Sequence, residues 1–546
     1  MQNKLNMEVN QRKIPVIQAY QVYNKMRKCK KTKSAVPGEL PARLRQQFDA
    51  ELAEPAAIIF NNIAKRAKWP QSWKEEYGTV LKKTNIPEDE SMIRIISITS
   101  QLSTLMERFI IDWLIIYIED KLDRDQFGGQ KGHSIAHYLI EIQNFVLYNQ
   151  DLSKPLATLF AGVDISKGFN NVDHKKIVTI LAEWIPGWLL KIVVSYLAGR
   201  TLTLRRQQHT SGTEQMPGGT GAGTPLGLLL FLVLFNGAGP KASKVSIGEQ
   251  ITVPRRQRKP MDKGKVKWVD DGSLMASLDM ARCLVPDTRP DLQRPVPYRG
   301  RFEMRLPREL NKLQDEMDSL NTYATNHLMS INHQKTKVLL FSRHRKYDFV
   351  PEIQLIPNEN IEVVEEMKIV GFVLRSDMKT CSNTEYIVKK TYAIVRRLKA
   401  LGASRTRLVD VLQKQVLSVL QLAVPAWDCL LTAQERTDIE RVLRTGLRII
   451  WGEDYISFEQ VLDDSGLRTM QQTRNKIVNK FVRRTVQHNK FSKWFSIQPE
   501  LQIQTRRRKY NFKPVPSRTV AFGRSAIPTF THIANNLKQI PSSSKP

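Results

Sequence analysis

The stretch Val266-Lys-Trp-Val-Asp-Asp-Gly-Ser-Leu274 places two adjacent carboxylates, Asp270 and Asp271, at the tip of an apolar, strand-like run. Asp-Asp-Gly is also ordinary turn chemistry, because Asp bonds its own backbone and Gly accepts a positive φ. A second acid-bearing run, Thr158-Leu-Phe-Ala-Gly-Val-Asp164, argues for more than a turn. If the two runs pair side by side in a sheet, Asp164 converges on the two neighbouring acids.

Such a cluster of acids points to a metal site. Clustered carboxylates are tolerated when a divalent cation neutralises them, and oxygen ligands in near-octahedral geometry suit Mg²⁺. Two such ions about 3.5–4 Å apart form the clamp used for in-line phosphoryl displacement. We therefore predict that Asp164, Asp270 and Asp271 bind two Mg²⁺ ions, with Mn²⁺ as an alternative ion.

Three motifs in a fixed order carry a family resemblance. They are Asp-Ile-Ser-Lys-Gly-Phe-Asn-Asn-Val-Asp-His at 164–174, Gly-Thr-Pro-Leu-Gly-Leu-Leu-Leu-Phe at 223–231 and Trp-Val-Asp-Asp at 268–271. The set resembles the palm motifs of reverse transcriptases, most closely those of non-LTR (LINE-type) retrotransposons, over roughly residues 30–450. The resemblance implies an α+β fold shaped like a right hand, with fingers, a palm on an antiparallel sheet and a helical thumb. It also implies an RNA-directed DNA polymerase that uses dNTPs, an RNA template and a DNA or RNA primer.

The resemblance implies roles for further residues around the nucleotide. Lys82, Lys83 and Arg94 lie on a predicted fingers hairpin and would contact the triphosphate, although they would also suit exposed charges on a hairpin. Phe169 would exclude a 2′-hydroxyl by a steric clash, or would simply be a core residue. Gly223, in a Gly-rich loop that lacks the P-loop lysine, is a further nucleotide contact.

A lysine further along the chain is the predicted proton donor. The segment Asn332-His-Gln-Lys-Thr-Lys337 resembles a family segment in which a Lys is thought to protonate the leaving pyrophosphate. Lys335 is our candidate and Lys337 the second, while a solvated Lys at a strand edge is the alternative.

The largest departure from the family lies in the Gly-rich loop. Gly221 and Ala222 stand where many members have Pro and Gln, and that Gln contacts the nucleotide and the template strand. The alternative hypothesis is therefore a catalytically degenerate, retroelement-derived protein that binds nucleic acid. RNA-directed RNA synthesis is a third hypothesis, against which Phe169 argues.

The charge of the chain favours a polyanionic partner. Its 546 residues include 84 Lys and Arg against 53 Asp and Glu, a net charge of +31, and such a field makes binding to nucleic acid salt-sensitive. Its four cysteines form no Cys-x-x-Cys, which fits a reduced environment. We see no signal peptide and no apolar run long enough for a bilayer, so we expect an intracellular protein of the nucleus or cytoplasm.

Basic residues near the C-terminus predict a nucleic-acid surface. Lys476, Lys480, Arg483 and Arg484 recur at helical spacing. Arg506, Arg507 and Arg508 follow in a tail whose interleaved aromatics, Tyr510, Phe512 and Phe522, would suit stacking on bases. A solvated tail is the alternative. Protein partners are not predicted.

Apolar periodicity gives the organisation of the chain. We expect a weakly structured basic extension at 1–35, fingers with part of the palm at 36–157, and the palm at 158–375. The palm carries two basic insertions, a mobile hairpin or loop at 237–265 and a surface insertion at 283–308. A helical thumb-like region at 376–500 and a basic tail at 501–546 follow. No zinc knuckle, endonuclease or RNase H-like acid set is seen, so we expect a polymerase-only portion. Helices are predicted over Ala42–Lys68, Leu102–Leu122, Ile135–Asn149, His174–Trp184, Leu310–His327, Tyr386–Leu401, Arg405–Leu422 and Ala433–Trp451.

Overall fold

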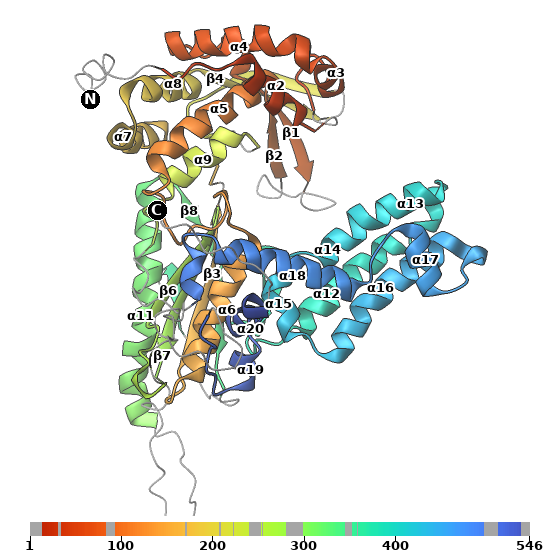
Figure 1. Cartoon of the computed structure of the whole chain (residues 1–546). Helices are drawn as coiled ribbons and strands as arrows, with labels where there is room; N and C mark the ends of the chain where they lie inside the picture. Colours follow the sequence, from red (N-terminus) through yellow and green to blue (C-terminus); the bar gives the residue numbers. More distant parts are fainter. Residues whose placement is uncertain are drawn as a thin grey trace, which may run out of the picture. The chain divides into compact units, whose positions relative to one another are not determined.

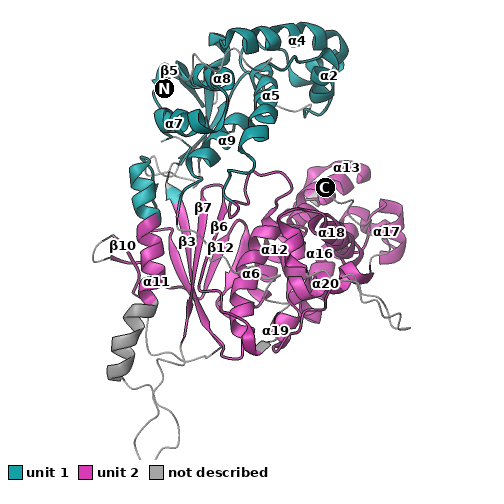
Figure 2. Ribbon diagram, turned by 60° about the vertical axis from the view of Figure 1, so that its left-hand side comes forward, with its two compact units in different colours: residues 1–123, 165–238, 320–331 teal, residues 124–164, 239–319, 332–546 magenta. Residues whose placement is uncertain are grey.

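The computed structural model describes residues 14–30, 34–82, 93–166, 168–169, 172–206, 209–221, 223–239, 253, 255–279, 299–343, 352–356, 359–495 and 512–536. The chain forms two compact units, each drawn from separated segments (Figure 2). Unit 1 consists of residues 1–123, 165–238 and 320–331, and unit 2 of residues 124–164, 239–319 and 332–546. Helices and antiparallel strand pairs occur in both, so the predicted α+β class is confirmed.

Unit 1 combines a four-stranded sheet with helices. The strand order is β2-β1-β4-β5, with β1 and β2 antiparallel and β1 and β4 parallel. The predicted fingers hairpin is therefore present as a strand pair. The elements are α2 (Ala19–Arg27), α3 (Ala42–Gln47), α4 (Asp49–Arg66), β1 (Glu75–Lys82), β2 (Ile93–Ile98), α5 (Gln101–Ile118), α7 (His174–Trp184), α8 (Gly187–Leu197), β4 (Arg200–Arg206), β5 (His209–Met216), α9 (Pro225–Leu234) and β8 (Ser330–Ile331).

Unit 2 is built on a sheet whose central strand is β3 (Ala157–Ser166). It pairs on one side with β7 (Asp271–Leu278), which pairs in turn with β6 (Lys263–Trp268), and on the other with β9 (Lys337–Phe341). Helix α6 (Ile135–Asp151) lies against this sheet (Figure 1). Helix α11 (Arg299–Asn326) and the short pairs β10 (Gln354–Ile356)–β11 (Glu359–Asn360) and β12 (Glu366–Ile369)–β13 (Phe372–Arg375) complete this part.

The rest of unit 2 is helical, as predicted. Helix α16 occupies the residues expected for it, because Thr432 and Glu435 form a capping box at its start. Helix α12 packs along α16. The elements are α12 (Cys381–Val395), α13 (Arg405–Val411), a π-helical segment (Leu412–Leu417), α14 (Ser418–Leu420), α15 (Val424–Trp427), α16 (Ala433–Trp451), α17 (Phe458–Ser465), α18 (Met470–Val486), η10 (Phe491–Trp494), α19 (Val520–Gly523) and α20 (Ala526–Asn536).

Two expectations for surface segments were wrong. Residues 14–30 are ordered, because α2 buries Val22 and Met26 against its neighbours. The segment 237–265, predicted to be a mobile hairpin or loop, does contain the start of the β6–β7 hairpin, but its Arg258 is buried between Asp151 and the backbone oxygen of Pro516. Apolar packing accounts for the first segment, and a buried ion-pair partner with strand pairing for the second; composition reveals neither partner. Of the predicted insertion 283–308, residues 283–298 lie outside the described part and the rest begins α11.

The predicted tail also contributes to the core. Phe512 and Phe522 are buried, and Phe522 packs against Tyr148 on α6 at 6.2 Å between ring centroids. Arg518 donates its backbone N–H to Asp151 at 2.7 Å. These two aromatics are therefore unavailable for stacking on bases. None of the helices in the described part of the chain has the length and apolarity needed to cross a bilayer.

Candidate active site

Asp164 and Asp271 face each other across two antiparallel strands. The register of β3 and β7 makes them direct partners, and directly opposed side chains lie on one face with Cβ atoms about 4.5–5.5 Å apart. The predicted side-by-side pairing of the two acid-bearing runs is thus observed. Like charges in this position repel, so the arrangement favours a cation between them.

Asp270 lies in the two-residue turn that joins β6 to β7. The register pairs Trp268 with Asp271, which leaves Val269 and Asp270 as the connection. Val269 has a φ of 59°, and a β-branched residue in this region is an uncommon, strained conformation. The turn places Asp270 directly beside Asp271 at the end of the sheet.

Lys335 provides the cation seen at Asp164. Its Nζ lies 3.2 Å from the Asp164 Oδ2, with the lysine side chain 56% exposed and the aspartate 30%. Asn332 fixes the loop, because it donates its backbone N–H to the Asp164 carbonyl oxygen at 2.8 Å and accepts the Lys335 N–H at 3.1 Å. The second candidate, Lys337, instead pairs with Glu362. The geometry therefore favours Lys335 over Lys337 as the lysine that acts at this site.

The donor set fits a Mg²⁺ site that substrate completes. In the described part of the chain, no three acidic, His or Cys side chains have the mutual arrangement of a ready-made metal site. Mg²⁺, however, is usually held by one or two carboxylates together with waters and substrate phosphates. Two opposed carboxylates with a third beside them match that incomplete set of oxygen ligands.

A buried tyrosine supports the sheet behind the acids. The Tyr138 hydroxyl on α6 lies 2.7 Å from the Ser273 Oγ, two residues beyond Asp271 on β7. Burial raises the pKa of Tyr138, and the negative charge of Asp271 adds to the effect. Tyr138 therefore stays neutral and joins α6 to the strand that bears Asp271.

The predicted fingers residues lie in unit 1. Lys82 ends β1 and is exposed, and Arg94 lies on β2 opposite Leu81. Lys83 lies outside the described residues. The hairpin pairing is thus as predicted for Lys82 and Arg94, while contact of the three basic residues with a triphosphate stays a prediction.

Phe169 and Gly223 also lie in unit 1. The Phe169 ring stacks on Phe231 of α9 at 4.7 Å, and its carbonyl oxygen accepts the Thr220 N–H at 3.0 Å. Gly223 has a φ of 116°, and a Cβ there would lie 3.2 Å from the Ser97 oxygen of β2. Phe169 is only partly buried, so its ring packs at one face and keeps accessible surface.

Gly221 is required by its surroundings in this chain. It has a φ of 68°, which proline cannot adopt, and a Cβ there would lie 2.9 Å from both carboxylate oxygens of Glu76. Glu76 is itself buried and paired with Arg200 at 2.6 Å. The departure from the family at this position therefore accompanies a buried ion pair beneath the loop. Ala222 lies outside the described residues.

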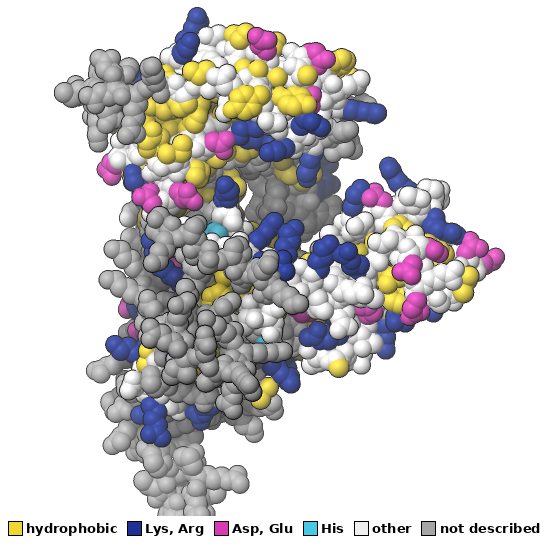
Figure 3. All heavy atoms as spheres, viewed as in Figure 1, with side chains coloured by type: hydrophobic (Ala, Val, Ile, Leu, Met, Phe, Trp, Pro, Cys, Tyr) yellow, Lys and Arg dark blue, Asp and Glu magenta, His cyan; other side chains and the backbone are white. Residues whose placement is uncertain are grey.

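The predicted basic face of α18 is formed. Lys476, Lys480, Arg483 and Arg484 are exposed, whereas Val478 and Val482 on the opposite side are buried. Dark blue Lys and Arg side chains are visible over this part of unit 2 in Figure 3. Arg506, Arg507 and Arg508 lie outside the described residues.

An aromatic cluster anchors α18 to α6. The His137 ring stacks on Phe491 at 3.9 Å and its Nε2 lies 3.2 Å from the Thr485 Oγ1. Burial, with the charges of neighbouring basic groups, lowers the pKa of His137 to about 3. The ring is therefore neutral near pH 7 and packs as an aromatic residue between the two helices.

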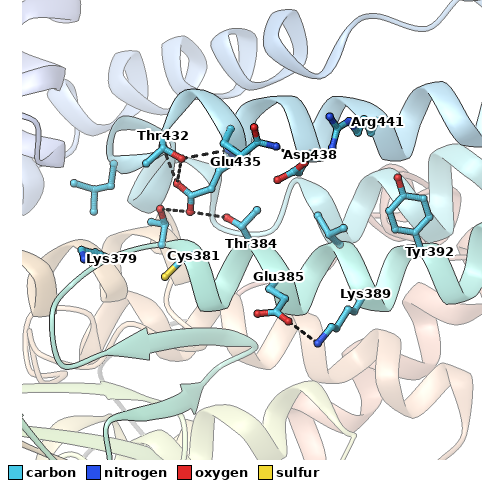
Figure 4. Close-up of a pocket in the computed structure, with 14 residues that line it drawn as sticks. Lys379, Cys381, Thr384, Glu385, Lys389, Tyr392, Thr432, Glu435, Asp438 and Arg441 are labelled. Atoms are coloured by element: carbon cyan, nitrogen blue, oxygen red, sulfur yellow. Dashed lines mark hydrogen bonds and ion pairs between the residues drawn. The ribbon is translucent and has the colours of Figure 1, made fainter.

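A pocket of about 530 Å³ lies between α12 and α16, away from the predicted site residues. Figure 4 shows Glu435 of α16 pointing toward Thr384 of α12. Its carboxylate accepts hydrogen bonds from Thr380 at 2.7 Å, Thr384 at 3.2 Å and the Thr432 hydroxyl at 2.7 Å. These bonds satisfy the buried acid, so its role is to join the two helices.

The sequence analysis did not identify two buried polar features that lie next to predicted site residues. One is the Glu76–Arg200 pair, for which no local signal exists because the partners are 124 residues apart. The other is Gln126, buried against the Asp-Asp turn. The only local signal was the run of glycines in the stretch Gln126-Phe-Gly-Gly-Gln-Lys-Gly-His-Ser134.

Comparison with known proteins supports the resemblance drawn from the motifs. The chain is 26% identical over 202 residues to the RNA-directed DNA polymerase from mobile element jockey of Drosophila melanogaster. The matched region covers 36% of this chain and 22% of that protein. It is 27% identical over 177 residues to the probable RNA-directed DNA polymerase from transposon X-element of the same species, covering 32% and 19%. The matched part thus spans about a fifth of each relative. No protein-family profile matches the chain.

Proposed function

We propose that this chain is the reverse transcriptase of a non-LTR retrotransposon, an RNA-directed DNA polymerase that extends a primer 3′-hydroxyl with dNTPs. The observation that carries the proposal is the opposition of Asp164 and Asp271 across β3 and β7, with Asp270 on the adjoining turn. The similarity to two RNA-directed DNA polymerases of mobile elements supports it. In this proposal the β3–β7–β6 sheet is the palm, the β1–β2 hairpin belongs to the fingers and the helices from α12 to α18 form the thumb.

In this proposal three aspartates bind the metal ions and Lys335 supplies a proton. Asp164, Asp270 and Asp271 would hold two Mg²⁺ ions, which would supply charge neutralisation for the displacement at phosphorus. Phosphoryl transfer needs mainly positioning and electrostatic stabilisation, and the opposed strands fix two of the acids on one face. Lys335 holds a proton at its Nζ, 3.2 Å from Asp164, and donates it to the departing pyrophosphate.

Residues of unit 1 select and hold the nucleotide in this proposal. Lys82 and Arg94 on the hairpin, with Lys83, attract the triphosphate by charge. Phe169, held against Phe231, excludes a 2′-hydroxyl by a clash, which is how a pocket discriminates without added affinity. Gly223 leaves room beside β2 because it carries no side chain.

Primer extension tests the function directly. The wild-type chain, given an RNA template, an annealed primer, dNTPs and Mg²⁺, is expected to extend the primer, and Asp270→Asn is expected not to. Asn keeps the size of the side chain but removes the charge that a metal ligand supplies. Extension by both chains would exclude a role for the Asp270 carboxylate, and extension by neither would overturn the proposed activity.

An inactive wild type would favour the second candidate, a nucleic-acid-binding protein without catalysis. Ala222, in place of the glutamine found in many family members, is the observation behind this alternative. Salt-sensitive RNA binding without extension would support it. Restoring the family sequence at Gly221 would not repair such a chain, because the backbone there excludes proline.

The basic face of α18 is expected to set the salt dependence of nucleic-acid binding. Each phosphate contact contributes about 0.9 to the slope of log K against log salt for a duplex. The double variant Lys476→Gln, Lys480→Gln should therefore lower that slope by about two and weaken binding of all sequences alike. A fluorescence-anisotropy titration of a primer–template duplex at several salt concentrations measures it.

A matched pair of lysines provides the control. Lys389 and Lys414 are exposed in the same unit, but each is already paired with an acid one turn earlier on its helix, Glu385 and Asp410. The variant Lys389→Gln, Lys414→Gln removes the same formal charge. If it changes the slope as much as the α18 variant does, general charge and not the α18 face accounts for binding.

A further inference from the structure

The Asp-Asp turn is strained and needs support from outside its own hairpin. Val269 adopts a φ of 59°, and a β-branched residue there costs on the order of 1–3 kcal/mol unless its surroundings hold it. A turn free to relax would move Asp270 and Asp271 together, because both follow Val269 directly. The positions of two predicted metal ligands thus depend on what holds Val269.

A single buried glutamine satisfies the backbone of Val269 on both sides. The Gln126 Oε1 accepts the Val269 N–H at 2.9 Å, and the Gln126 Nε2 donates to the Val269 carbonyl oxygen at 3.1 Å. The same Oε1 accepts the Gly128 N–H at 3.0 Å. Gln126 is only 3% exposed, and a side-chain amide is suited to this task because it both donates and accepts.

The backbone around Gln126 is fixed to the end of β6. Phe127 donates its N–H to the Lys267 carbonyl oxygen at 2.7 Å, and Lys267 donates its N–H to the Asp125 oxygen at 2.7 Å. These two bonds form a short parallel bridge just before the turn. Gln126 is therefore aimed at Val269 by the backbone as well as by its own hydrogen bonds.

Gly128 allows this close approach. A Cβ at this position would lie 2.5 Å from the Val269 Cγ2 and 2.6 Å from the Val269 backbone nitrogen. Backbone atoms cannot move aside as the end of a flexible side chain can, so any other residue would push the segment off the turn. Gly128 therefore has a packing role against the Asp-Asp turn.

We propose that Gln126 and Gly128 are positioning residues that hold the Val269 turn and thereby set Asp270 and Asp271 in place for metal binding. The inference rests on the proposed function for its catalytic consequence, but its geometric content concerns the metal site alone. Gln126 acts through the backbone of Val269 and touches no reacting atom.

The variant Gln126→Met tests the proposal, because Met keeps the length of the side chain and removes its hydrogen bonds. We expect Mn²⁺ binding, followed by electron paramagnetic resonance, to weaken about 10-fold, as is typical when a residue that orients metal ligands is lost. We expect kcat for nucleotide addition to fall about 10- to 100-fold, with the Kd for primer–template unchanged. Gly128→Ala should act in the same direction, although it also strains the fold.

A second-site change separates positioning from general destabilisation. Glycine accepts a positive φ without strain, so Val269→Gly should partly restore Mn²⁺ affinity and kcat in the Gln126→Met background. Gln143→Met is the matched control, since Gln143 is equally buried on α6 but forms no hydrogen bond to the turn among the described residues. It should leave both quantities as in the wild type.

The possible outcomes distinguish this inference from the proposed function. Weakened Mn²⁺ binding in Gln126→Met, together with a wild type that does not extend primers, would support the positioning role and overturn the polymerase. Unchanged Mn²⁺ affinity in Gln126→Met, or equal losses in Gln143→Met, would overturn the positioning role whatever the activity. A wild type that binds no Mn²⁺ even with a non-extendable primer–template and a dNTP present would overturn both.

Discussion

The variant Asp164→Asn is expected to lose at least about 10³-fold in primer extension while unfolding at the same temperature as the wild type or higher. Asp164 is the only acid of the three on β3, and its loss removes one side of the predicted metal site. The lost rate corresponds to about 4 kcal/mol of charge stabilisation at the phosphate oxygens. Asn retains the shape of the side chain, so binding of primer–template should persist.

The expected unfolding temperature of Asp164→Asn follows from the strand register. Asp164 lies directly opposite Asp271, and removing one of two opposed like charges relieves their repulsion. The ion pair with Lys335 is lost at the same time, but it is partly exposed and such pairs contribute little. The two effects oppose each other, so the folded state should not be weakened.

Single-nucleotide incorporation measures the loss of activity. Thermal unfolding in the presence of a chelator measures the change in stability. Asp410→Asn is the control, because Asp410 also pairs with one exposed lysine, Lys414, but lies on α13 away from the sheet. It should leave incorporation unchanged. Incorporation by Asp164→Asn within tenfold of the wild type, or a fall in Tm of several degrees, would contradict the prediction.

The variant Arg200→Met is expected to destabilise the chain by about 3–5 kcal/mol, because it leaves a buried carboxylate without its partner. The Arg200 Nε and Nη2 lie 2.7 Å and 2.6 Å from the Glu76 Oε1, and both side chains are fully buried. Arg200 also donates to the Tyr196 carbonyl oxygen at 3.2 Å and lies over the Tyr196 ring. Among the described residues, no other cation pairs with the Glu76 carboxylate.

The loss should extend to the Gly-rich loop. Gly221 packs on the Glu76 carboxylate, and the Tyr196 hydroxyl donates to Thr224, the residue that caps α9. Moving Glu76 therefore disturbs the loop that carries Gly223. Urea-induced unfolding followed by tryptophan fluorescence measures the stability change, since Trp69 packs against Tyr196 at 5.1 Å.

Two further variants make this prediction decisive. Arg205→Met, at an exposed arginine on the same strand β4, should change stability by less than about 0.5 kcal/mol. The double variant Glu76→Leu, Arg200→Met should recover most of the loss, because apolar replacement of a whole buried pair is often neutral or stabilising. An Arg200→Met chain as stable as Arg205→Met would show that the pair contributes nothing.

Local sequence patterns determined the secondary structure where one segment carried all the information. The helix at Ala433–Trp451 follows from its apolar spacing and from Thr432 and Glu435 at its start. The predicted helix at Ala42–Lys68 instead divides at Phe48, between α3 and α4. The hairpin of β1 and β2 was also foreseen.

The order of the motifs allowed one tertiary prediction, the meeting of Asp164 with Asp271. It succeeded because Asp164 lies near the end of β3 and Asp271 begins β7, and antiparallel pairing brings the end of one strand beside the start of the next. The roles of Asp270, Lys335 and the bound metal remain predictions for the experiments above.

Only the tertiary structure decided which polar and aromatic residues are buried. The sequence by itself suggested exposure for Arg258 and Phe522, yet both are buried through contacts with segments more than 100 residues away. Gln126 in turn reaches Val269 across 143 residues. Composition and periodicity describe neighbours along the chain, whereas the burial of a polar group depends on a partner elsewhere that satisfies its hydrogen bonds. That partner exists only once the chain has folded.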